Sequence, residues 1–493
     1  MSLVNNINKK EQCVFIYATA GFSDRVLSKS NLINFLEVKV EKIVIFSPLG
    51  DLKEYQKAFS KKNVIVEKFK EDEYKQYYKK NRFVRFLSLF RQFIHNNKYN
   101  TFIVDFFRSV FISQIKSNRK YTGKIIGFIW ESMSRLFKSS LILRKLLIWV
   151  ESRVLVINPH KEFFELHKPD LVIVSALSGI KYNENFAREA KSNGVKVCCL
   201  MGSWDYAVGL GMPGFEPDFI SAWNEDQKND LITLNDIDKK KVQVNGIPYW
   251  DSRYSSSEIM EKNDFFEKLK LNPEKKIILN ATHPPSRFPW GPEFIEKIAL
   301  AINDGILHES QILVRIHPTH YHQEEGNMRF AEILAKYEDL SKKYDHVILN
   351  IPNTQGTRPD FKFGLEENIM MNSLLKYSDV MITMFSTMQI EAALFDLPVV
   401  NYAIREMADS DDAGTRLDPQ SVFKMPHVQR IIQTGGVKTA LTFEELYSHT
   451  NDYLDDPSLD SRERKIIEKN FVGDFKGNAS QATADYVHTI LNS

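Results

Sequence analysis

The chain has 493 residues, of which 43% are hydrophobic and 26% are charged, and its formal net charge is only +2. This length and composition predict a globular protein with two domains. No apolar run reaches the roughly 18 residues of a spanning helix, which excludes an integral helical membrane protein. Cys13, Cys198 and Cys199 give no disulfide framework, and residues 1–12 lack the apolar core of a secretory signal. We therefore expect a cytoplasmic protein.

The first elements alternate between strands and helical segments. Residues 13–20 are apolar and predict a strand, and residues 21–25 are the loop that we expect after it. Two further apolar runs, at 43–46 and 64–66, predict short strands with helices between them. Asp24 lies in the first loop and is therefore a candidate acid at a strand end.

A strongly basic segment interrupts this alternation. Between Lys75 and Val150 there are sixteen Lys or Arg residues and two acidic residues, so the segment carries +14 and the rest of the chain about −12. Large apolar side chains are interspersed with the basic ones, a pattern typical of helices on an anionic membrane surface. A helical insertion with a solvated basic side is the alternative. We expect no nucleic-acid partner, because no nucleic-acid-binding motif accompanies the charge.

The strand pattern resumes after the basic segment. Residues 170–175 and 195–200 predict two buried strands, and Ser203-Trp204-Asp205 follows the second of them. Asp205 is therefore another candidate acid at a strand end, with the alternative that it caps a turn and only positions a substrate. Residues 218–225 predict a further short strand, and the polar stretch at 252–263 predicts a linker to a second domain.

The second domain is predicted to open with the aliphatic strand at 276–279. The loop after this strand contains Thr282, His283 and Arg287. Ligands of open α/β sheets bind at the carboxyl ends of strands, so these three side chains are candidates for contact with a diphosphate. A proline-rich surface loop without a ligand is the alternative.

Another aliphatic run, residues 311–316, ends at His317-Pro318 because proline does not continue a strand. His317 therefore lies at the carboxyl end of a strand, where an imidazole can donate to a phosphate or protonate a leaving oxygen. Arg315 precedes it and is a further candidate for donor binding. The simpler interpretation of His317 is a polar group satisfied at a strand end.

The most informative segment is residues 378–400, which predicts a buried strand, a hydroxyl-bearing turn, a short helix and another buried strand. This order places Ser386 and Thr387 at a helix N-terminus, where free backbone N–H groups favour a phosphate. Glu391 lies one helical turn further on the same face, where a carboxylate suits the hydroxyls of a ribose. The alternative is an ordinary strand–helix–strand unit with a Ser-Thr cap.

Two groups of residues suggest a metal, and we expect none in either place. His317, His320 and His322 lack the spacing of a helical zinc site, and Asp409, Asp411 and Asp412 lie in an acidic loop that we expect to be solvated. We therefore predict a protein that needs no metal and no cofactor.

Together, the His-Pro and Ser-Thr motifs resemble the nucleotide-binding half of GT-B glycosyltransferases. They are most similar to bacterial surface-polysaccharide enzymes such as capsule sialyl- and Kdo-transferases, and to teichoic-acid glycerophosphotransferases. Residues 195–205, 218–225 and 244–251 also fit, so the resemblance covers about residues 170–490. It implies an α/β fold with two Rossmann-like domains facing a cleft. These would be residues 1–255, with the basic helical insertion at about 75–160, and residues 256–493, whose final helix returns to the first domain.

The resemblance also implies an activity: sugar transfer from a nucleotide donor to a surface-glycan or lipid-linked acceptor, inverting and without metal. Thr282, His283, Arg287, Arg315, His317, Ser386, Thr387 and Glu391 would then hold the donor. Catalysis would fall to Asp24 or Asp205 as the base and to His317. The basic insertion would keep the enzyme peripheral on the inner face of the membrane. Three alternatives stay open: a CDP-glycerol or CDP-ribitol phosphotransferase, a nucleotide-sugar epimerase, and a membrane-associated scaffold without chemistry.

Overall fold

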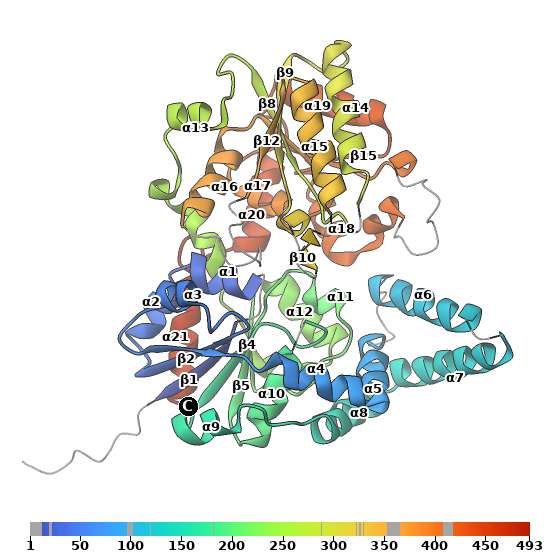
Figure 1. The fold of residues 1–493 in the computed structure, drawn as a ribbon, viewed down its shortest axis with the longest axis vertical. Coiled ribbons are helices and arrows are strands. Elements are labelled where there is room, and N and C mark those ends of the chain that lie inside the picture. Colours follow the sequence, from blue (N-terminus) through green and yellow to red (C-terminus); the bar gives the residue numbers. More distant parts are fainter. Residues whose placement is uncertain are drawn as a thin grey trace, which may run out of the picture. The chain divides into compact units, whose positions relative to one another are not determined.

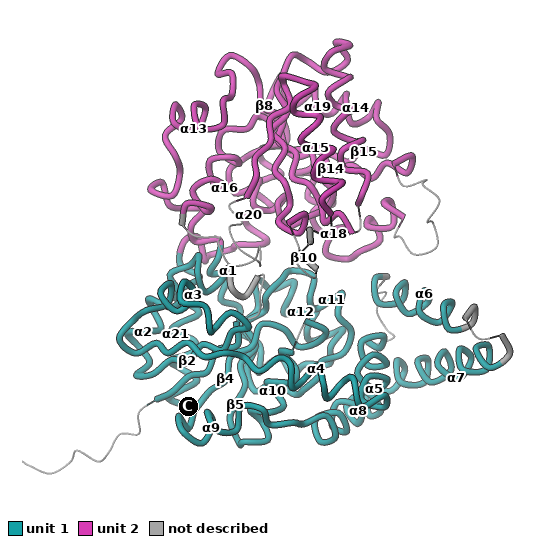
Figure 2. The backbone as a smooth tube through the Cα atoms, viewed as in Figure 1, with its two compact units in different colours: residues 1–249, 478–493 teal, residues 250–477 magenta. Residues whose placement is uncertain are grey.

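The computed structural model describes residues 12–18, 22–95, 102–118, 120–180, 182–286, 288–321, 323–324, 327–328, 330–352, 365–407 and 418–493. The chain forms two compact units, which Figure 2 colours separately. Unit 1 comprises residues 1–249 and 478–493, and unit 2 comprises residues 250–477. The chain therefore leaves unit 1 once and returns to it for its last helix.

The described part of unit 1 is built on a seven-stranded parallel sheet with the strand order β3-β2-β1-β4-β5-β6-β7. The strands are β1 Cys13–Tyr17, β2 Lys42–Ser47, β3 Val64–Lys68, β4 Leu171–Val174, β5 Lys196–Leu200, β6 Phe219–Ala222 and β7 Val242–Val244. The central strands are buried along their length, as expected for runs of Val, Ile and Phe covered on both faces. The strand order reverses between β1 and β4, which makes their carboxyl ends the switch point of this sheet.

Helices accompany this sheet (Figure 1). They are α1 Phe22–Lys29, α2 Leu32–Glu37, α3 Lys53–Ala58, α9 Lys161–His167, α10 Asn183–Ser192, α11 Tyr206–Gly209, α12 Glu225–Leu234 and α21 Ala479–Leu491. The prediction of a loop at 21–25 was wrong, because residues 22–25 form the first turn of α1. Leu27, in the next turn of α1, is buried, and burial of such apolar side chains favours the helix over the loop.

A helical insertion lies between β3 and β4. It contains α4 Glu71–Lys80, α5 Arg82–Gln92, α6 Phe102–Asn118, α7 Lys120–Ser139 and α8 Leu141–Val154. These helices have a core of their own, which includes Phe90, Trp130 and Leu147. In Figure 1, α6 and much of α7 project away from the sheet of unit 1.

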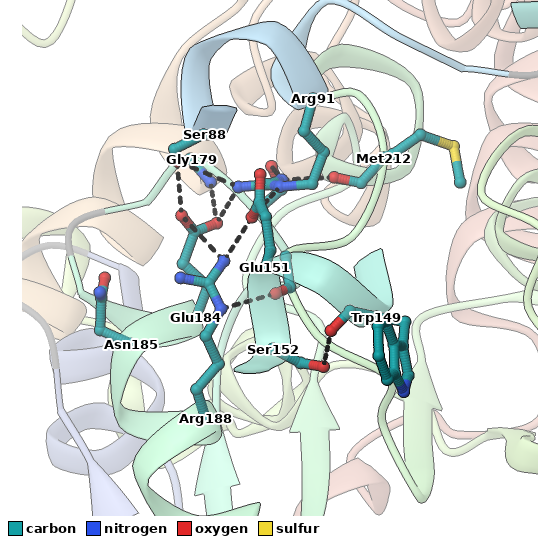
Figure 3. A network of polar contacts seen from close by, with 12 residues as sticks. Ser88, Arg91, Trp149, Glu151, Ser152, Gly179, Glu184, Asn185, Arg188 and Met212 are labelled. Carbon is teal, nitrogen blue, oxygen red and sulfur yellow. Dashed lines mark hydrogen bonds and ion pairs between the residues drawn. The ribbon is translucent and has the colours of Figure 1, made fainter. Parts of the chain in front are cut away.

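A buried ion network joins this insertion to α10 of unit 1 (Figure 3). The guanidinium of Arg91 donates to Glu151 Oε2 and to Glu184 Oε2, both at 2.8 Å. Arg188 Nη2 donates to the same Glu151 oxygen at 2.7 Å. Burial acts to raise the pKa of Glu184, but the guanidiniums of Arg91 and Arg188 outweigh it and hold that pKa below its usual value. The positive charges of two arginines and the negative charges of two glutamates therefore neutralise one another where water is excluded.

The described part of unit 2 is built on a six-stranded parallel sheet with the order β12-β9-β8-β13-β14-β15. The strands are β8 Lys276–Ala281, β9 Ser310–Arg315, β12 Val347–Asn350, β13 Val380–Thr383, β14 Val399–Tyr402 and β15 Lys438–Ala440. A short antiparallel pair, β10 Gln323–Glu324 and β11 Asn327–Met328, follows β9. The chain builds from β8 outward to β12 and then restarts at β13, so the switch point lies between β8 and β13.

The helices of unit 2 are α13 Lys262–Leu269, α14 Gly291–Asn303, α15 Ala331–Lys343, α16 Leu365–Tyr377, α17 Met388–Leu394, α18 Pro426–Ile432, α19 Phe443–Asp455 and α20 Ser461–Val472. Apolar side chains from α14, α15 and α19 pack against the sheet. The predicted linker at 252–263 contains 3₁₀ turns and the buried side chain of Arg253, so much of it is packed structure. The sequence-based fold class, two parallel α/β domains with a helical insertion in the first, is confirmed.

Candidate functional site

The carboxyl edge of the unit 2 sheet brings three of the predicted loops together. His317 follows β9, Thr282 and His283 follow β8, and Ser386 and Thr387 follow β13. These three strands are direct neighbours, because β8 pairs with β9 on one side and with β13 on the other. The loops therefore meet at the switch point, where ligands of open α/β sheets bind.

A hydrogen bond links the first two loops. The backbone N–H of His317 donates to Thr282 Oγ1 at 2.8 Å, and the backbone N–H of Thr282 donates to the carbonyl of Arg315 at 3.0 Å. On the His317 ring, Nδ1 lies 2.7 Å from Thr319 Oγ1. A 3₁₀ turn begins at Pro318, three residues beyond the end of β9, and holds the half-buried imidazole at the sheet edge. Thr282 thus positions His317 through the backbone.

His283 links the β8 loop to the loop after β13. Its Nε2 accepts a hydrogen bond from the backbone N–H of Met384 at 3.0 Å, so its ring proton lies on Nδ1. Burial lowers the pKa of His283 to about 4, which keeps the imidazole neutral near pH 7. The Nε2 atom is thereby used to hold the loop that carries Ser386 and Thr387. A direct contact of His283 with a donor stays a prediction, and it would have to come from Nδ1.

The Ser-Thr pair lies where the sequence predicts it, at the start of α17. Ser386 Oγ accepts from the backbone N–H of Met388, the first residue of α17, at 3.2 Å, so this serine forms a local hydroxyl turn that leads into the helix. The side chain of Thr387 makes no capping hydrogen bond, although its carbonyl accepts from the backbone N–H groups of Ile390 and Glu391. Both hydroxyl-bearing residues are half-buried.

Glu391 is buried and forms an ion pair that the sequence does not suggest. Its Oε2 accepts from Arg253 Nε at 3.0 Å and from Arg253 Nη2 at 2.5 Å. Arg253 Nη1 also donates to Asn372 Oδ1 on α16. Arg253 was missed because it lies in the stretch predicted to be a linker, and no motif surrounds it. A ribose contact by Glu391 therefore has to come from a carboxylate that is already paired with an arginine.

Arg315 is likewise engaged within unit 2. Its guanidinium donates from Nη1 to Asn350 Oδ1 at 2.5 Å and from Nη2 to Glu367. Asn350 ends the neighbouring strand β12, and Glu367 lies on α16. These contacts fix the end of β9 next to His317. Arg287, another predicted donor ligand, lies outside the described residues.

The two candidate bases belong to unit 1. Asp24 lies in the first turn of α1, and its side chain is outside the part that the structure describes. Asp205 precedes α11, and Ser203 Oγ donates to its Oδ1 at 2.5 Å. The Ser-Trp-Asp segment is therefore a local turn that holds the Asp205 carboxylate.

No group of three metal-binding side chains occurs among the described residues. His320 is buried, and its Nδ1 contacts the carbonyl of His317 at 3.0 Å. Burial lowers the pKa of His320. His322, Asp409, Asp411 and Asp412 lie outside the described residues.

Unit 1 has a pocket at its own switch point. It lies at the carboxyl ends of β1, β4 and β5, beside Tyr17, Ser175 and Gly202, and takes in about 510 Å³, open solvent included. Thr483 of α21 forms part of its wall, and within the described residues its Oγ1 is buried without a hydrogen-bond partner. This pocket lies at the sheet edge that carries Asp205 in its β5 loop.

No protein-family model and no curated protein sequence matches the chain. Solved structures match it over almost its whole length. The MnaA–UDP co-structure from S. aureus is 13% identical with a TM-score of 0.52, covering 98% of this chain and 97% of that chain. A glycosyltransferase from Rickettsia africae is 11% identical with a TM-score of 0.50, covering 98% and 99%.

A third structure, UDP-GlcNAc 2-epimerase from Neisseria meningitidis bound to UDP-GlcNAc, is 14% identical with a TM-score of 0.50, covering 98% of this chain and 100% of that chain. Identities this low establish the fold alone. The chain has the GT-B-like fold of two Rossmann-like α/β domains.

Proposed function

We propose that this protein is a glycosyltransferase that moves a sugar from a nucleotide-activated donor to a surface-glycan or lipid-linked acceptor. The observation that carries the proposal is the meeting of His317, Thr282 and the Ser386-Thr387 pair at the switch point of unit 2. Two hydrogen bonds, from the His317 N–H to Thr282 Oγ1 and from the Met384 N–H to His283 Nε2, hold these loops in register. Hydrogen-bonding groups that are held in place in this way suit the phosphates of a leaving nucleoside diphosphate or monophosphate.

In this proposal the donor phosphate contacts the hydroxyls and backbone N–H groups around Ser386 and Thr387. The contact between His317 Nδ1 and Thr319 holds the imidazole in place. The ring would then face the phosphate or the departing oxygen. Glu391 holds the ribose, with Arg253 fixing its carboxylate. The solved relatives add support, because one was determined with UDP and another with UDP-GlcNAc.

The acceptor side belongs to unit 1. We propose that Asp205 or Asp24 removes the proton of the acceptor hydroxyl in an inverting reaction without metal. The hydrogen bond from Ser203 orients the Asp205 carboxylate for such a role. The basic insertion at about 75–160 would keep the enzyme beside an anionic membrane, where lipid-linked acceptors reside.

The first test is thermal stabilisation by CMP, CDP, UDP, GDP and their sugar conjugates, measured without added metal. A ligand at one hundred times its dissociation constant stabilises the folded state by about 2.7 kcal/mol, which raises the melting temperature. We expect one nucleotide class to do so. His317→Ala should abolish the shift, whereas His308→Ala, at the opposite end of β9, should keep it because His308 contacts Asp455 on the surface.

An equal shift in both histidine variants would show that the nucleotide binds away from His317. No shift with any nucleotide would contradict a donor site that is already formed in the free enzyme.

A nucleotide-sugar epimerase is the second candidate, favoured by the structural similarity to the meningococcal epimerase. An epimerase converts its UDP-sugar without an acceptor, whereas a transferase releases the nucleotide only as sugar reaches an acceptor. Incubation of the protein with the stabilising donor alone, followed by chromatography of the sugars, separates the two activities. Transfer of a polyol phosphate from a CDP donor to an acceptor, with release of CMP, would instead indicate the CDP-glycerol or CDP-ribitol phosphotransferase.

A further inference from the structure

Two helices of the insertion expose large apolar side chains to solvent. On α7 they are Ile125, Phe128, Ile129 and Leu136, and on α8 they are Leu141, Ile142, Leu146, Trp149 and Val154. Ile142 is 78% exposed, Phe128 69% and Trp149 57%. Single exposed apolar residues are normal on a protein surface, but a concentration of nine over two consecutive helices marks an interaction surface.

The exposed residues form a face that the core of the insertion does not use. On α7, Trp130 and Ser134 are buried, and on α8, Leu147, Ile148 and Glu151 are buried. The exposed positions Ile142, Leu146 and Trp149 follow a spacing of four and three residues, so they form one stripe on the side of α8 away from this core. Both helices therefore carry an apolar face inward and another outward.

The charges on these helices indicate an anionic partner for the exposed face. Residues 120–154 contain seven Lys or Arg residues and two acidic residues. Lys124, Arg135 and Arg153 are exposed beside the apolar stripe, and the Arg153 guanidinium lies 5.9 Å from the Trp149 ring centre. Of the two acids, Glu151 is buried in the ion network, and Glu131 pairs with Arg135 at 2.7 Å. An apolar face bordered by cations, with a tryptophan at its edge, is suited to the headgroup region of an anionic bilayer.

The geometry favours lying on a membrane over crossing it. No described helix has the length and apolar character needed for a span. Only Ser140 separates α7 from α8, so the two helices follow each other directly. In Figure 1, α6 and α7 extend beyond the sheet of unit 1, so that the sheet does not cover this part of the insertion.

We infer that the outward face of α7 and α8, defined by Ile125, Phe128, Ile129, Leu136, Leu141, Ile142, Leu146 and Trp149, inserts into the headgroup region of an anionic lipid bilayer. The cations Lys124 and Arg153 neutralise the lipid phosphates beside it. This deepens the proposed membrane contact of the basic insertion by assigning it to one face, and it does not depend on the identity of the donor. The ion network of Arg91, Glu151, Glu184 and Arg188 would fix that face relative to unit 1.

The test is sedimentation of the full chain with two kinds of vesicle, at low and at physiological salt. One kind contains phosphatidylcholine alone, and the other also contains about 30% phosphatidylglycerol, which is anionic. We expect binding to the anionic vesicles and little binding to the neutral ones. The double variant Ile142→Asp with Trp149→Asp should lower the partition coefficient at least tenfold. Because both side chains are exposed, its melting temperature should match that of the unchanged protein.

Leu166→Asp is the matched control, since Leu166 on α9 is 71% exposed but lies outside this face. It should bind vesicles normally. Equal loss in the control and in the double variant, or unchanged binding in the double variant, would overturn the inference. So would a stable dimer in gel filtration that the double variant converts to monomer, since the face would then contact a second copy. Thermal shifts with nucleotides, measured on the same variant, report the donor site separately.

Discussion

His283 illustrates how a single side chain can organise the candidate site through the backbone of a neighbouring loop. Its neutral imidazole accepts from the backbone of the next loop, and its ring lies 5.0 Å from that of Phe288. A charged imidazole could not accept that hydrogen bond at Nε2. The arrangement of Ser386 and Thr387 is therefore linked to the protonation state of a residue on another strand.

This linkage predicts a pH dependence. The pKa of His283 is about 4 in the folded protein, against an ordinary value near 6.5, so between these values only the unfolded chain binds the proton. His283 should therefore reduce stability by about 2 to 3 kcal/mol as the pH falls from 6.5 to 4. Glutamine does not bind a proton in this pH range, so in His283→Gln this loss of stability is absent. The unchanged protein should therefore melt above the variant by a smaller margin at pH 5 than at pH 7.5. A difference that does not change with pH would contradict the assignment.

At the residue scale, the sequence predicts the positions of the site residues better than their contacts. Aliphatic runs that end at Thr282, His317 and Ser386 are visible because strand ends follow from periodicity and proline. The partners of Glu391 and Arg315 are not visible, since Arg253, Asn350 and Glu367 are brought to them by folding over distances of 35 to 138 residues. No local pattern encodes such a pair.

At the element scale, helices α5 and α8 of the insertion pack on α10 of unit 1 and share a buried ion network with it. Glu151 on α8 lies between Arg91 on α5 and Arg188 on α10, and all three side chains are fully buried. The sequence predicts the insertion from its charge but gives no sign of this network, because its members come from three separate segments, at residues 91, 151 and 184–188. The first turn of α1 was missed for a related reason, since the helix depends on packing rather than on propensity.

Breaking this network should loosen the insertion. Glu151→Gln removes the negative charge between two buried guanidiniums, and loss of one partner of a buried ion pair costs about 3 to 5 kcal/mol. We expect a loss of that order in the free energy of urea-induced unfolding, with faster hydrogen exchange in α5 and α8. Ser152→Ala is the neighbouring control, because Ser152 Oγ donates only to the Trp149 carbonyl at the surface. A loss below about 1 kcal/mol in Glu151→Gln would show that the network contributes little.

At the scale of the whole molecule, the chain closes unit 1 with its last helix. Residues 478–493 return to unit 1 after 228 residues spent in unit 2. Within unit 1, α21 packs on α2 and buries Tyr486, Val487 and Ile490. Lys39 Nζ lies 2.7 Å from Asp485 on the same helix. The domain order follows from strand patterns, whereas the return of the last helix was implied only by the resemblance to GT-B enzymes.

This topology predicts that changes at the C-terminus act on the unit built from the N-terminus. Ile490→Ala removes a buried side chain and leaves a cavity, so we expect a loss of about 2 to 4 kcal/mol in stability. Thr489→Ala, on the exposed side of the same turn, should change stability by less than about 0.5 kcal/mol. Hydrogen exchange resolves where the loss occurs. Faster exchange is expected in β1, β4 and β5 and not in β8, β9 and β13, because α21 belongs to the core of unit 1. Equal acceleration in both sets of strands would mean that the two units unfold as one, and acceleration in β8, β9 and β13 alone would place α21 with unit 2.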